Sequence, residues 1–260
     1  MRFLGHSSVR IEMGGRVVLT DPVLTGRVGP LRRVGPAPSA ADRADVDLVL
    51  ISHLHNDHLH LPSLRLLARS PRVVVPRGAG AWLRSRGVRH VVELGVGQEL
   101  MDGDLRVLGV PAMHSGHRWG PRSTRGPQAR AMGHVLESGG LRMYVAGDTD
   151  LFDGMSSFGR LDVALLPVWG WGPTLGPGHL DPARAAKAVA VLRPRVAVPV
   201  HWGSLTLAGL TRVPGGPGGR MRRLLVEPPR TFAASVAEAT PDTTVAVTAP
   251  GQPVRLPVPR

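Results

Sequence analysis

The sequence predicts an α+β fold in which two β-sheets are enclosed by helices. Short apolar runs with strand character fill the first half of the chain, and the second half alternates between strand and helix patterns. No composition shift typical of a linker divides the 260 residues, a length that can bury one large core. We therefore expect one domain over residues 1–260, least constrained by the sequence beyond about 228.

The first predicted elements are strands and a short helix. Residues 9–13 and 16–21 flank Gly14 and Gly15, a two-residue turn signal that indicates a β-hairpin. The apolar run 47–52 is typical of a buried strand, and residues 62–69 are expected to form a short helix, since Pro62 is tolerated in a first turn. Further strands are expected at 73–75, 91–94, 105–110, 133–137 and 143–146.

The second half begins with a predicted strand at 163–167, then a helix at 182–192 and a strand at 196–200. Asp181 can cap the first-turn amides of the helix, and Pro182 needs no amide partner there. Its apolar side chains recur on one face, so we expect it to pack against a sheet. The glycine-rich residues 215–219 are predicted to be a flexible loop.

His53, His55, Asp57 and His58 lie close together, directly after the apolar run 47–52. Imidazole nitrogens and carboxylate oxygens are the ligands that zinc and similar divalent ions prefer. A solvated histidine-rich loop is the alternative, but with 11 His in the chain this pattern arises by chance in roughly one such chain in a thousand. The segment therefore predicts a metal site, with too many ligands for one tetrahedral ion and too few for two.

Further ligands are expected at the ends of other predicted strands. His114, Asp148 and His201 each follow an apolar run. Loops at strand ends are where open α/β folds collect site residues, so these segments can converge with 53–58. A lone histidine after a strand is more often a structural residue, so the prediction depends on the joint pattern.

The whole series resembles the metal signature of the metallo-β-lactamase superfamily, residue for residue. The matching positions are His53, His55, Asp57, His58, His114, Asp148 and His201. Within the superfamily the chain most resembles the branch of L-ascorbate-6-phosphate lactonase and the N-acyl-phosphatidylethanolamine-hydrolysing phospholipase D. Segments 5–8, 19–22, 51–53, 178–182 and 201–203 carry that narrower resemblance, which extends from Phe3 to about Glu227.

The resemblance implies a four-layered αβ/βα sandwich with the site at the sheet edges. It also implies two divalent ions, zinc first and Mn²⁺ or Fe²⁺ as alternatives. The ligands implied for one ion are His53, His55 and His114, those for the other are Asp57, His58 and His201, and Asp148 is the implied bridge. A water between two such ions loses a proton near neutral pH, and the resulting hydroxide can attack a phosphorus or carbonyl centre.

Asp57 and His179 are the predicted catalytic residues. Asp57 can orient the hydroxide. His179 lies just ahead of the helix start at Asp181, in a segment that matches the branch, and can bind a phosphoryl or carbonyl oxygen or protonate a leaving group. Bracing the loop is the alternative role for His179. No side-chain nucleophile is expected, since the sequence has no Cys and no Gly-x-Ser-x-Gly segment.

Residues beside the predicted ligands are expected to act on them indirectly. Asp21 and Thr149 can orient ligands, although Asp21 before a proline is equally typical of a turn. Many members of the branch carry an aspartate where this chain has His60. Either His60 replaces that polar partner or a nearby ligand is oriented differently. Trp169 and Trp171 indicate either a loop near the cleft or core packing.

A formal net charge of +13 has two interpretations. A positive field attracts anionic partners, but coding bias also enriches arginine, and Lys187 is the only lysine. Two arginine-rich loops are expected to rim the metal cleft and to favour an anionic small molecule or a phospholipid. The first contains Arg27, Arg32 and Arg33, and the second contains Arg118, Arg122, Arg125 and Arg130.

These features predict a dinuclear metal-dependent hydrolase acting on a phosphodiester, as phospholipase D does, or on a phosphorylated small molecule. A lactonase or other ester hydrolase needs the same centre, and the sequence does not separate the two. A nucleic-acid-binding protein with structural metals is disfavoured by an aromatic content of 4%. An iron-based oxidoreductase is a further alternative, although the diiron branch usually has a carboxylate in place of His55.

No apolar run approaches the roughly 20 residues that a membrane-spanning helix needs. Residues 1–6 also lack the uninterrupted apolar region of a signal peptide. We therefore expect a cytoplasmic location and no transmembrane segment, and the formation of a homo-oligomer stays open.

Overall fold

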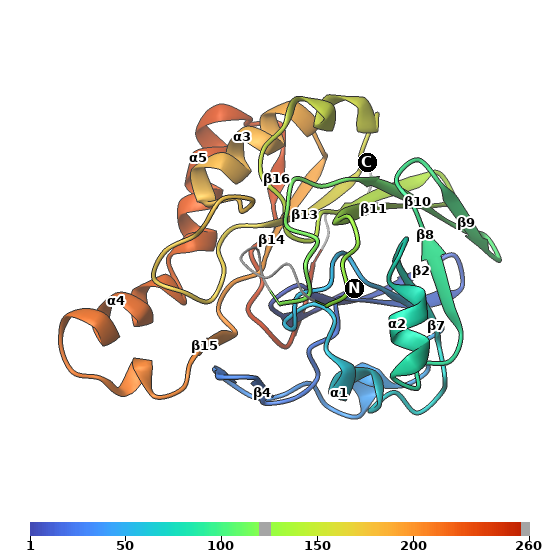
Figure 1. The fold of residues 1–260 in the computed structure, drawn as a ribbon. Coiled ribbons are helices and arrows are strands. Elements are labelled where there is room, and N and C mark those ends of the chain that lie inside the picture. Colours follow the sequence, from blue (N-terminus) through green and yellow to red (C-terminus); the bar gives the residue numbers. More distant parts are fainter. Residues whose placement is uncertain (120–125, 256–260) are drawn as a thin grey trace.

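The computed structural model describes residues 1–119 and 126–255, which form four layers. In Figure 1 two sheets lie at the centre, with α3 and α5 outside one sheet and α1 and α2 outside the other. The α-helices are α1 (Leu61–Leu64), α2 (Gly80–Ser85), α3 (Pro182–Leu192), α4 (Gly216–Leu224) and α5 (Pro228–Ala239). Short 3₁₀ helices are η1 (Ala41–Arg43), η2 (Asp153–Phe158) and η3 (Leu210–Arg212). The arrangement is the αβ/βα sandwich that the resemblance implied.

The N-terminal sheet has the strand order β17-β1-β2-β3-β6-β7-β8. Its strands are β17 (Gln252–Pro253), β1 (Arg2–Gly5), β2 (Ser8–Met13), β3 (Arg16–Thr20), β6 (Leu48–Leu50), β7 (Arg72–Pro76) and β8 (Val91–Leu94). β2 and β3 form the predicted hairpin, with Gly14 and Gly15 both at positive φ as its tight turn requires. β3, β6 and β7 are parallel, so their carboxyl ends meet at one edge.

The C-terminal sheet has the strand order β16-β14-β13-β12-β11-β10-β9. Its strands are β16 (Thr244–Val245), β14 (Val196–Val200), β13 (Val163–Pro167), β12 (Leu141–Val145), β11 (Met132–Ser138), β10 (Leu105–Pro111) and β9 (Glu99–Asp102). β12, β13 and β14 are parallel, and β10 runs in the same direction because two antiparallel pairings separate it from β12. Polar residues after these strands therefore gather at one edge.

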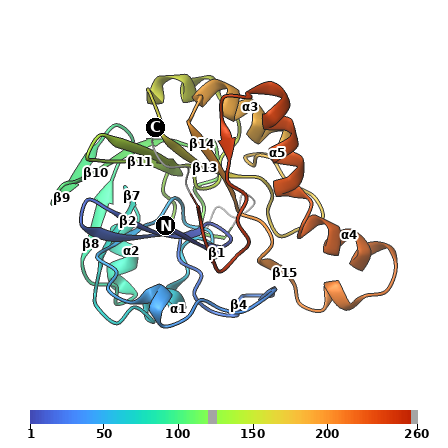
Figure 2. The same ribbon diagram turned by 180° about the vertical axis from the view of Figure 1, so that it is seen from behind.

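A small third sheet lies beside this edge, with the order β15-β5-β4. Its strands are β15 (Leu205–Leu207), β5 (Leu31–Arg33) and β4 (Arg27–Val28). Together with α4 it forms the part of the molecule that extends away from the two main sheets in Figures 1 and 2. Val23, Val28, Leu31 and Leu205 are buried together in a separate apolar cluster, so the β4–β5 hairpin has a small core of its own.

The main core fills the space between the two large sheets and continues beneath α3 and α5. α3 has the predicted bounds, and the Asp181 carboxylate accepts a hydrogen bond from the amide of Arg184 at 2.8 Å. Ala185, Val189 and Leu192 are buried, as the apolar periodicity predicted. A second apolar cluster lies beneath α1 and α2.

Most predicted strands and the helix 182–192 are confirmed, but two predictions are wrong. The helix predicted at 62–69 ends at Leu64, because the next residues form tight i→i−3 turns ahead of Pro71. The loop predicted at 215–219 instead begins helix α4. Pro217 lies in its first turn, and a Cβ on Gly218 would lie 1.9 Å from the Val213 carbonyl oxygen, so glycine is needed there for close packing.

Helices α2 and α5, which the sequence patterns did not predict, complete the outer layers. Across the described residues, none of the helices combines the length and the apolar character needed to cross a bilayer.

Candidate metal centre

The predicted metal ligands lie together where the two large sheets share an open edge. The segment 53–58 follows β6, His114 follows β10, Asp148 follows β12 and His201 follows β14. These four strands run in the same direction within their sheets, so their carboxyl ends bring segments distant in sequence to one place.

One group of side chains, here called the imidazole cluster, consists of His53, His55 and His114. Nε2 of His53 lies 3.0 Å from Nδ1 of His55, and Nε2 of His114 lies 3.1 Å from the same atom. One nitrogen from each residue lies within 4.8 Å of the others. Three nitrogens this close can bind one ion and leave a fourth tetrahedral position open.

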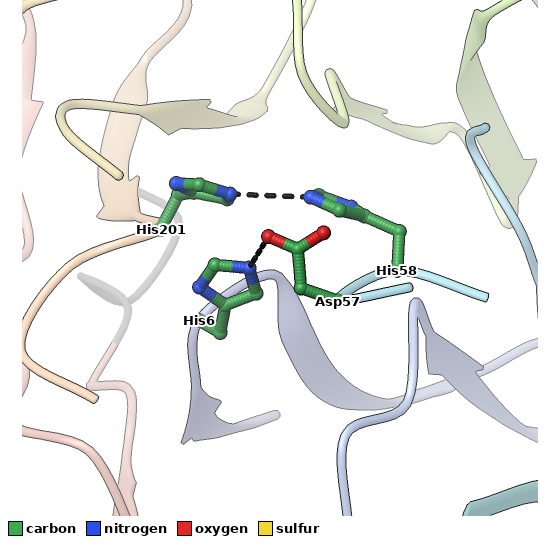
Figure 3. Close-up of side chains that lie close together, drawn as sticks. All are labelled: His6, Asp57, His58 and His201. Carbon is green, nitrogen blue, oxygen red and sulfur yellow. Dashed lines mark hydrogen bonds and ion pairs between the residues drawn. The ribbon is translucent and has the colours of Figure 1, made fainter. Parts of the chain in front are cut away.

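A second group, here called the carboxylate cluster, consists of His6, Asp57, His58 and His201 (Figure 3). Nε2 of His58 lies 3.1 Å from Nε2 of His201, and Nε2 of His6 lies 3.2 Å from Oδ2 of Asp57. The three histidines are at most 1% exposed. This cluster is therefore deeper than the imidazole cluster, in which His55 and His114 are half-buried.

Asp148 lies between the two clusters. Its Oδ1 is 3.1 Å from Nε2 of His201, and its Oδ2 is 3.3 Å from Nε2 of His58. The carboxylate also lies within ligand distance of His53 and of His114. Asp148 is therefore placed where a carboxylate could contact ions at both clusters.

The outer hydrogen bonds of the histidines direct lone pairs into the centre. Nδ1 of His114 donates to the Gly178 carbonyl, and Nδ1 of His201 donates to the Trp169 carbonyl, each at 2.7 Å. Because these nitrogens carry the protons, the Nε2 lone pairs point inward. Nε2 of His55 is buried without a hydrogen-bond partner among the described residues. That nitrogen can carry the ring proton and so leave the lone pair of Nδ1 for the cluster. Inward imidazole lone pairs and carboxylates are a donor set that fits zinc-like divalent ions.

Burial and neighbouring charges set the protonation of these groups. Burial lowers the pKa of His55 to about 4 and that of His201 to about 3, so both are neutral at pH 7. Burial also lowers the pKa of His58, but the carboxylates of Asp148 and Asp21 outweigh it and raise that pKa well above its ordinary value. In the metal-free protein a proton therefore lies between His58 and His201, and a bound ion would replace it.

Both carboxylates of the centre are ionised. Burial raises the pKa of Asp57. Its hydrogen bond with His6 and the charge of His58 lower the pKa by more than burial raises it, so the net pKa lies below the usual range. Burial opposes ionisation of Asp148 in the same way, and the charges of His201 and His58 hold its pKa well below normal. Ionised carboxylates and neutral imidazoles are the forms that bind metal.

His6 is the member of the centre that the sequence analysis missed. It follows β1 at φ 58°, in the left-handed region, and its ring centroid lies 3.8 Å from that of His201. Its carbonyl accepts a hydrogen bond from the His201 amide at 2.7 Å, and His201 also has a positive φ of 62°. The segment 5–8 supported the family resemblance, and a histidine directly after a short strand was the available signal.

Asp21 contacts a predicted ligand directly, whereas the side chains of Thr149 and His60 bond to neighbouring residues instead. Oδ2 of Asp21 accepts a hydrogen bond from Nδ1 of His58 at 2.8 Å. Oγ1 of Thr149 accepts from the amide of Met113, the residue before His114, at 3.0 Å. Nδ1 of His60 lies 2.7 Å from Oγ of Ser63 at the start of α1 rather than beside a cluster member. His60 therefore supports the helix.

His179 lies at the open side of the centre. Its Nε2 is 3.6 Å from Oδ2 of Asp148, and its ring centroid is 4.7 Å from that of His114. Its Nδ1 lies 3.1 Å from the Gly176 carbonyl, and 26% of the side chain is exposed. The side chain is thus held by a loop and reaches both the centre and solvent.

Two of the arginines expected to bind anions instead bind main-chain carbonyls. The guanidinium of Arg33 is half-buried and donates to the carbonyls of Leu4 and Val23. Arg118 is 5% exposed and donates to the carbonyls of Leu54 and Leu59, which flank the 53–58 ligand segment. Burial lowers the pKa of each arginine to about 10, so both stay charged. They satisfy main-chain carbonyls at the end of β1 and in the surrounding loops.

The expectation that the arginine-rich loops rim the cleft is wrong for Arg33, whose side chain joins the β4–β5 hairpin to the end of β1, and for Arg130. Arg130 lines a different hollow, beside Arg77 and Leu94. Arg27 and Arg32 are exposed on β4 and β5. Arg122 and Arg125 lie outside the described residues.

A cavity of about 530 Å³ opens onto both clusters. Its lining includes His55, Asp57, Asp148, His179 and His201. The two tryptophans for which a cleft loop or core packing was expected differ in role. Trp171 lines the cavity and is 38% exposed, whereas Trp169 is 3% exposed and packs in the core. The volume is in the range of small-molecule sites.

The family model of the beta-lactamase superfamily domain matches residues 16–202. That span contains all seven predicted metal ligands, from His53 to His201 near its carboxyl end. The chain belongs to the metallo-β-lactamase superfamily.

Two curated relatives and one solved structure illustrate its similarity to known members. A UPF0173 metal-dependent hydrolase of Thermus thermophilus is 36% identical over 78% of this chain and 83% of its own length. An uncharacterized protein of Mycobacterium tuberculosis is 34% identical over 97% of this chain and 67% of its own. A metallo hydrolase from Ignicoccus hospitalis shares the fold with a TM-score of 0.69 at 23% identity, covering 96% of this chain and 95% of that one.

Proposed function

We propose that this metal-dependent hydrolase binds two divalent ions, zinc first, and hydrolyses a phosphodiester. The imidazole cluster would hold one ion. The other ion would be held by Asp57, His58 and His201, and Asp148 would be a ligand shared by both ions. The observation that carries the proposal is the set of lone pairs that the outer hydrogen bonds turn toward two adjacent points. When bound, such ions supply an activated water and neutralise charge on the attacked group.

The chain's own residues would orient the reactants. One carboxylate oxygen of Asp57 is fixed by His6, which leaves the other free to accept a proton or to orient a water. His179 is close enough to Asp148 to reach a substrate held between the clusters, and its exposed edge can donate a hydrogen bond to a leaving group. Its tether to the Gly176 carbonyl fixes Nδ1 and leaves Nε2 for this role.

An ester or lactone carbonyl is the second candidate for the attacked group. One observation favours it: among the described residues that line the cavity, Arg118 is the sole arginine or lysine, and its guanidinium already donates to two carbonyls. A carbonyl substrate needs no further cation. The resemblance to the phospholipase D branch favours the phosphodiester.

A metal and activity profile of one sample tests the proposal. Purified protein should contain about two divalent ions per chain by mass spectrometry. It should be assayed against a phosphodiester, a phosphomonoester, a lactone, a thioester and a β-lactam with the same chromophore where the chemistry allows. We expect turnover of the diester that is lost on chelation and restored by zinc. Full activity after complete removal of metal would refute the proposed mechanism.

A further inference from the structure

Part of the cavity lining is apolar and is here called the apolar wall. It consists of Val28, Pro30, Leu31, Trp119, Trp171 and Leu175. The β4–β5 hairpin and the 170–176 loop supply most of this wall, and candidate metal ligands line the same cavity. A molecule with its reactive group between the clusters would therefore place its other end against apolar side chains.

The wall is rigid where it meets the hairpin. Val28 and Leu31 are 3% and 4% exposed and pack with Val23 and Leu205 in their own apolar cluster. The side chain of Arg33 joins the hairpin to β1 through the Leu4 carbonyl at 2.9 Å. A preformed apolar surface needs little reorganisation to bind a ligand, so its contacts contribute directly to affinity.

Two indoles extend the wall toward solvent. Trp119 is 56% exposed and Trp171 is 38% exposed, and both line the cavity. Exposed tryptophans at the mouth of a cavity offer a large flat apolar surface at a small cost in conformational entropy. They suit an alkyl chain or an aromatic ring.

Charged groups are few in the lining away from the two clusters. In the part of the chain that the structure describes, the cation in the lining is Arg118, whose Nη1 donates to the carbonyls of Leu54 and Leu59. A negative group at the far end of a substrate, as in a carboxylated arm, would therefore lie against apolar side chains rather than beside an ion bound at the clusters.

We propose that the substrate carries an uncharged apolar group, an alkyl chain or an aromatic ring, beside its scissile bond, and that the β4–β5 hairpin and Trp171 bind that group. This inference rests on the proposed function for the position of the reactive end. It concerns the far end of the substrate and leaves the predicted preference for an anionic reactive group as a separate prediction.

Two substrate series with one leaving group test it. The first consists of p-nitrophenyl phosphodiesters whose other arm is methyl, butyl, hexyl or 5-carboxypentyl, and the second consists of p-nitrophenyl acetate, butyrate and hexanoate. We expect kcat/KM to rise by roughly three- to fourfold for each methylene that the wall covers. The 5-carboxypentyl diester should be a poorer substrate than the hexyl diester.

Trp171→Ala should lower the hexyl-to-methyl ratio of kcat/KM about tenfold, and Trp171→Phe should restore most of it. Met101→Ser, which removes a 57% exposed apolar side chain on β9 outside the cavity, is the matched control and should keep the wild-type ratio. An unchanged ratio in Trp171→Ala would overturn the assignment of that residue to the wall.

The two proposals fail in different ways. If neither series is hydrolysed, the proposed function fails, and calorimetric titration of the metal-loaded protein with the hexyl and methyl diesters still tests the wall. Tighter binding of the hexyl diester, by tenfold or more, supports it. Equal binding or equal kcat/KM across arm lengths, or preference for the carboxylated arm, would overturn the apolar wall even if hydrolysis is observed.

Discussion

The two ligand clusters differ in what surrounds them. Histidines of the carboxylate cluster are buried, and their outer partners include the ionised Asp21. The imidazole cluster has no carboxylate member, its His55 and His114 are half-buried, and His55 lines the cavity. A hydrogen-bonded carboxylate raises the basicity of the histidine that it holds and fixes the ring, so the deeper cluster is the more strongly organised of the two.

This difference predicts that the two clusters bind their ions with different affinities. We expect the carboxylate cluster to hold its ion more tightly near neutral pH, and the imidazole cluster to exchange its ion more readily because solvent reaches it. The same exposure gives the imidazole cluster contact with substrate. The following substitutions separate the clusters, from the largest expected effect to the smallest.

Removal of one imidazole from either cluster should abolish activity. His55→Ala and His58→Ala should each lower kcat/KM by about a thousandfold or more, because both ions contribute to the reaction. His55→Ala should retain about one metal equivalent after gel filtration, whereas His58→Ala should lose metal from the carboxylate cluster. Substantial activity in His55→Ala would show that the imidazole cluster is dispensable.

His179→Ala should lower turnover by roughly a hundredfold without loss of metal, since general acid catalysis contributes about that much. His90→Ala is the matched control, because Nδ1 of His90 also lies beside one main-chain carbonyl, that of Ser70 at 2.9 Å, on an exposed surface. Steady-state kinetics and metal content are measured together. Loss of a metal equivalent in His179→Ala would instead make His179 a ligand.

Asp21→Asn should weaken metal binding to the carboxylate cluster by about 10- to 100-fold, because it removes the charged partner of His58. Binding to the imidazole cluster should change less, because Asp21 reaches His53 only through the Ser52 hydroxyl. Zinc titration against a competing chelator resolves the two affinities. A proportionate loss at both clusters would indicate a general structural defect rather than a local one.

The clusters should also differ in pH dependence. The pKa of His58 is raised well above its ordinary value, so an ion must displace a proton at pH 7, and affinity should fall by about tenfold for each pH unit below that pKa. His55 has a pKa lowered to about 4, so it is already unprotonated and its cluster should bind with little pH dependence from pH 7 to pH 5. Titrations at pH 7, 6 and 5 measure both slopes, and equal slopes would contradict the assigned protonation states.

The smallest expected effect is that of His6→Asn, because His6 acts on Asp57 through a single hydrogen bond. Asparagine tolerates the positive φ at this position, so the substitution removes the imidazole without adding backbone strain. We expect a decrease of about three- to tenfold in the zinc affinity of the carboxylate cluster. A complete loss of that ion would mean that His6 is itself a ligand.

Local sequence patterns predicted most strands, the helix at 182–192 and the seven candidate ligands, because polar residues directly after apolar runs lie at strand ends in any parallel arrangement. His6 was missed because its role depends on a left-handed turn that brings β1 against the end of β14. Arg33 was misjudged for a similar reason. Whether a loop guanidinium faces solvent or main-chain carbonyls is decided by tertiary packing, which net charge does not encode.

The β4–β5 hairpin and the 170–176 loop line the cavity but carry none of the candidate metal ligands. The parts of the chain that would select a substrate are thus largely separate from those that would perform chemistry. Insertions or exchanges in these two loops can change what the protein accepts while the ligand-bearing strand ends stay intact. Members of the superfamily can diverge in specificity by this route, and a designer could transplant the hairpin between relatives to redirect the enzyme.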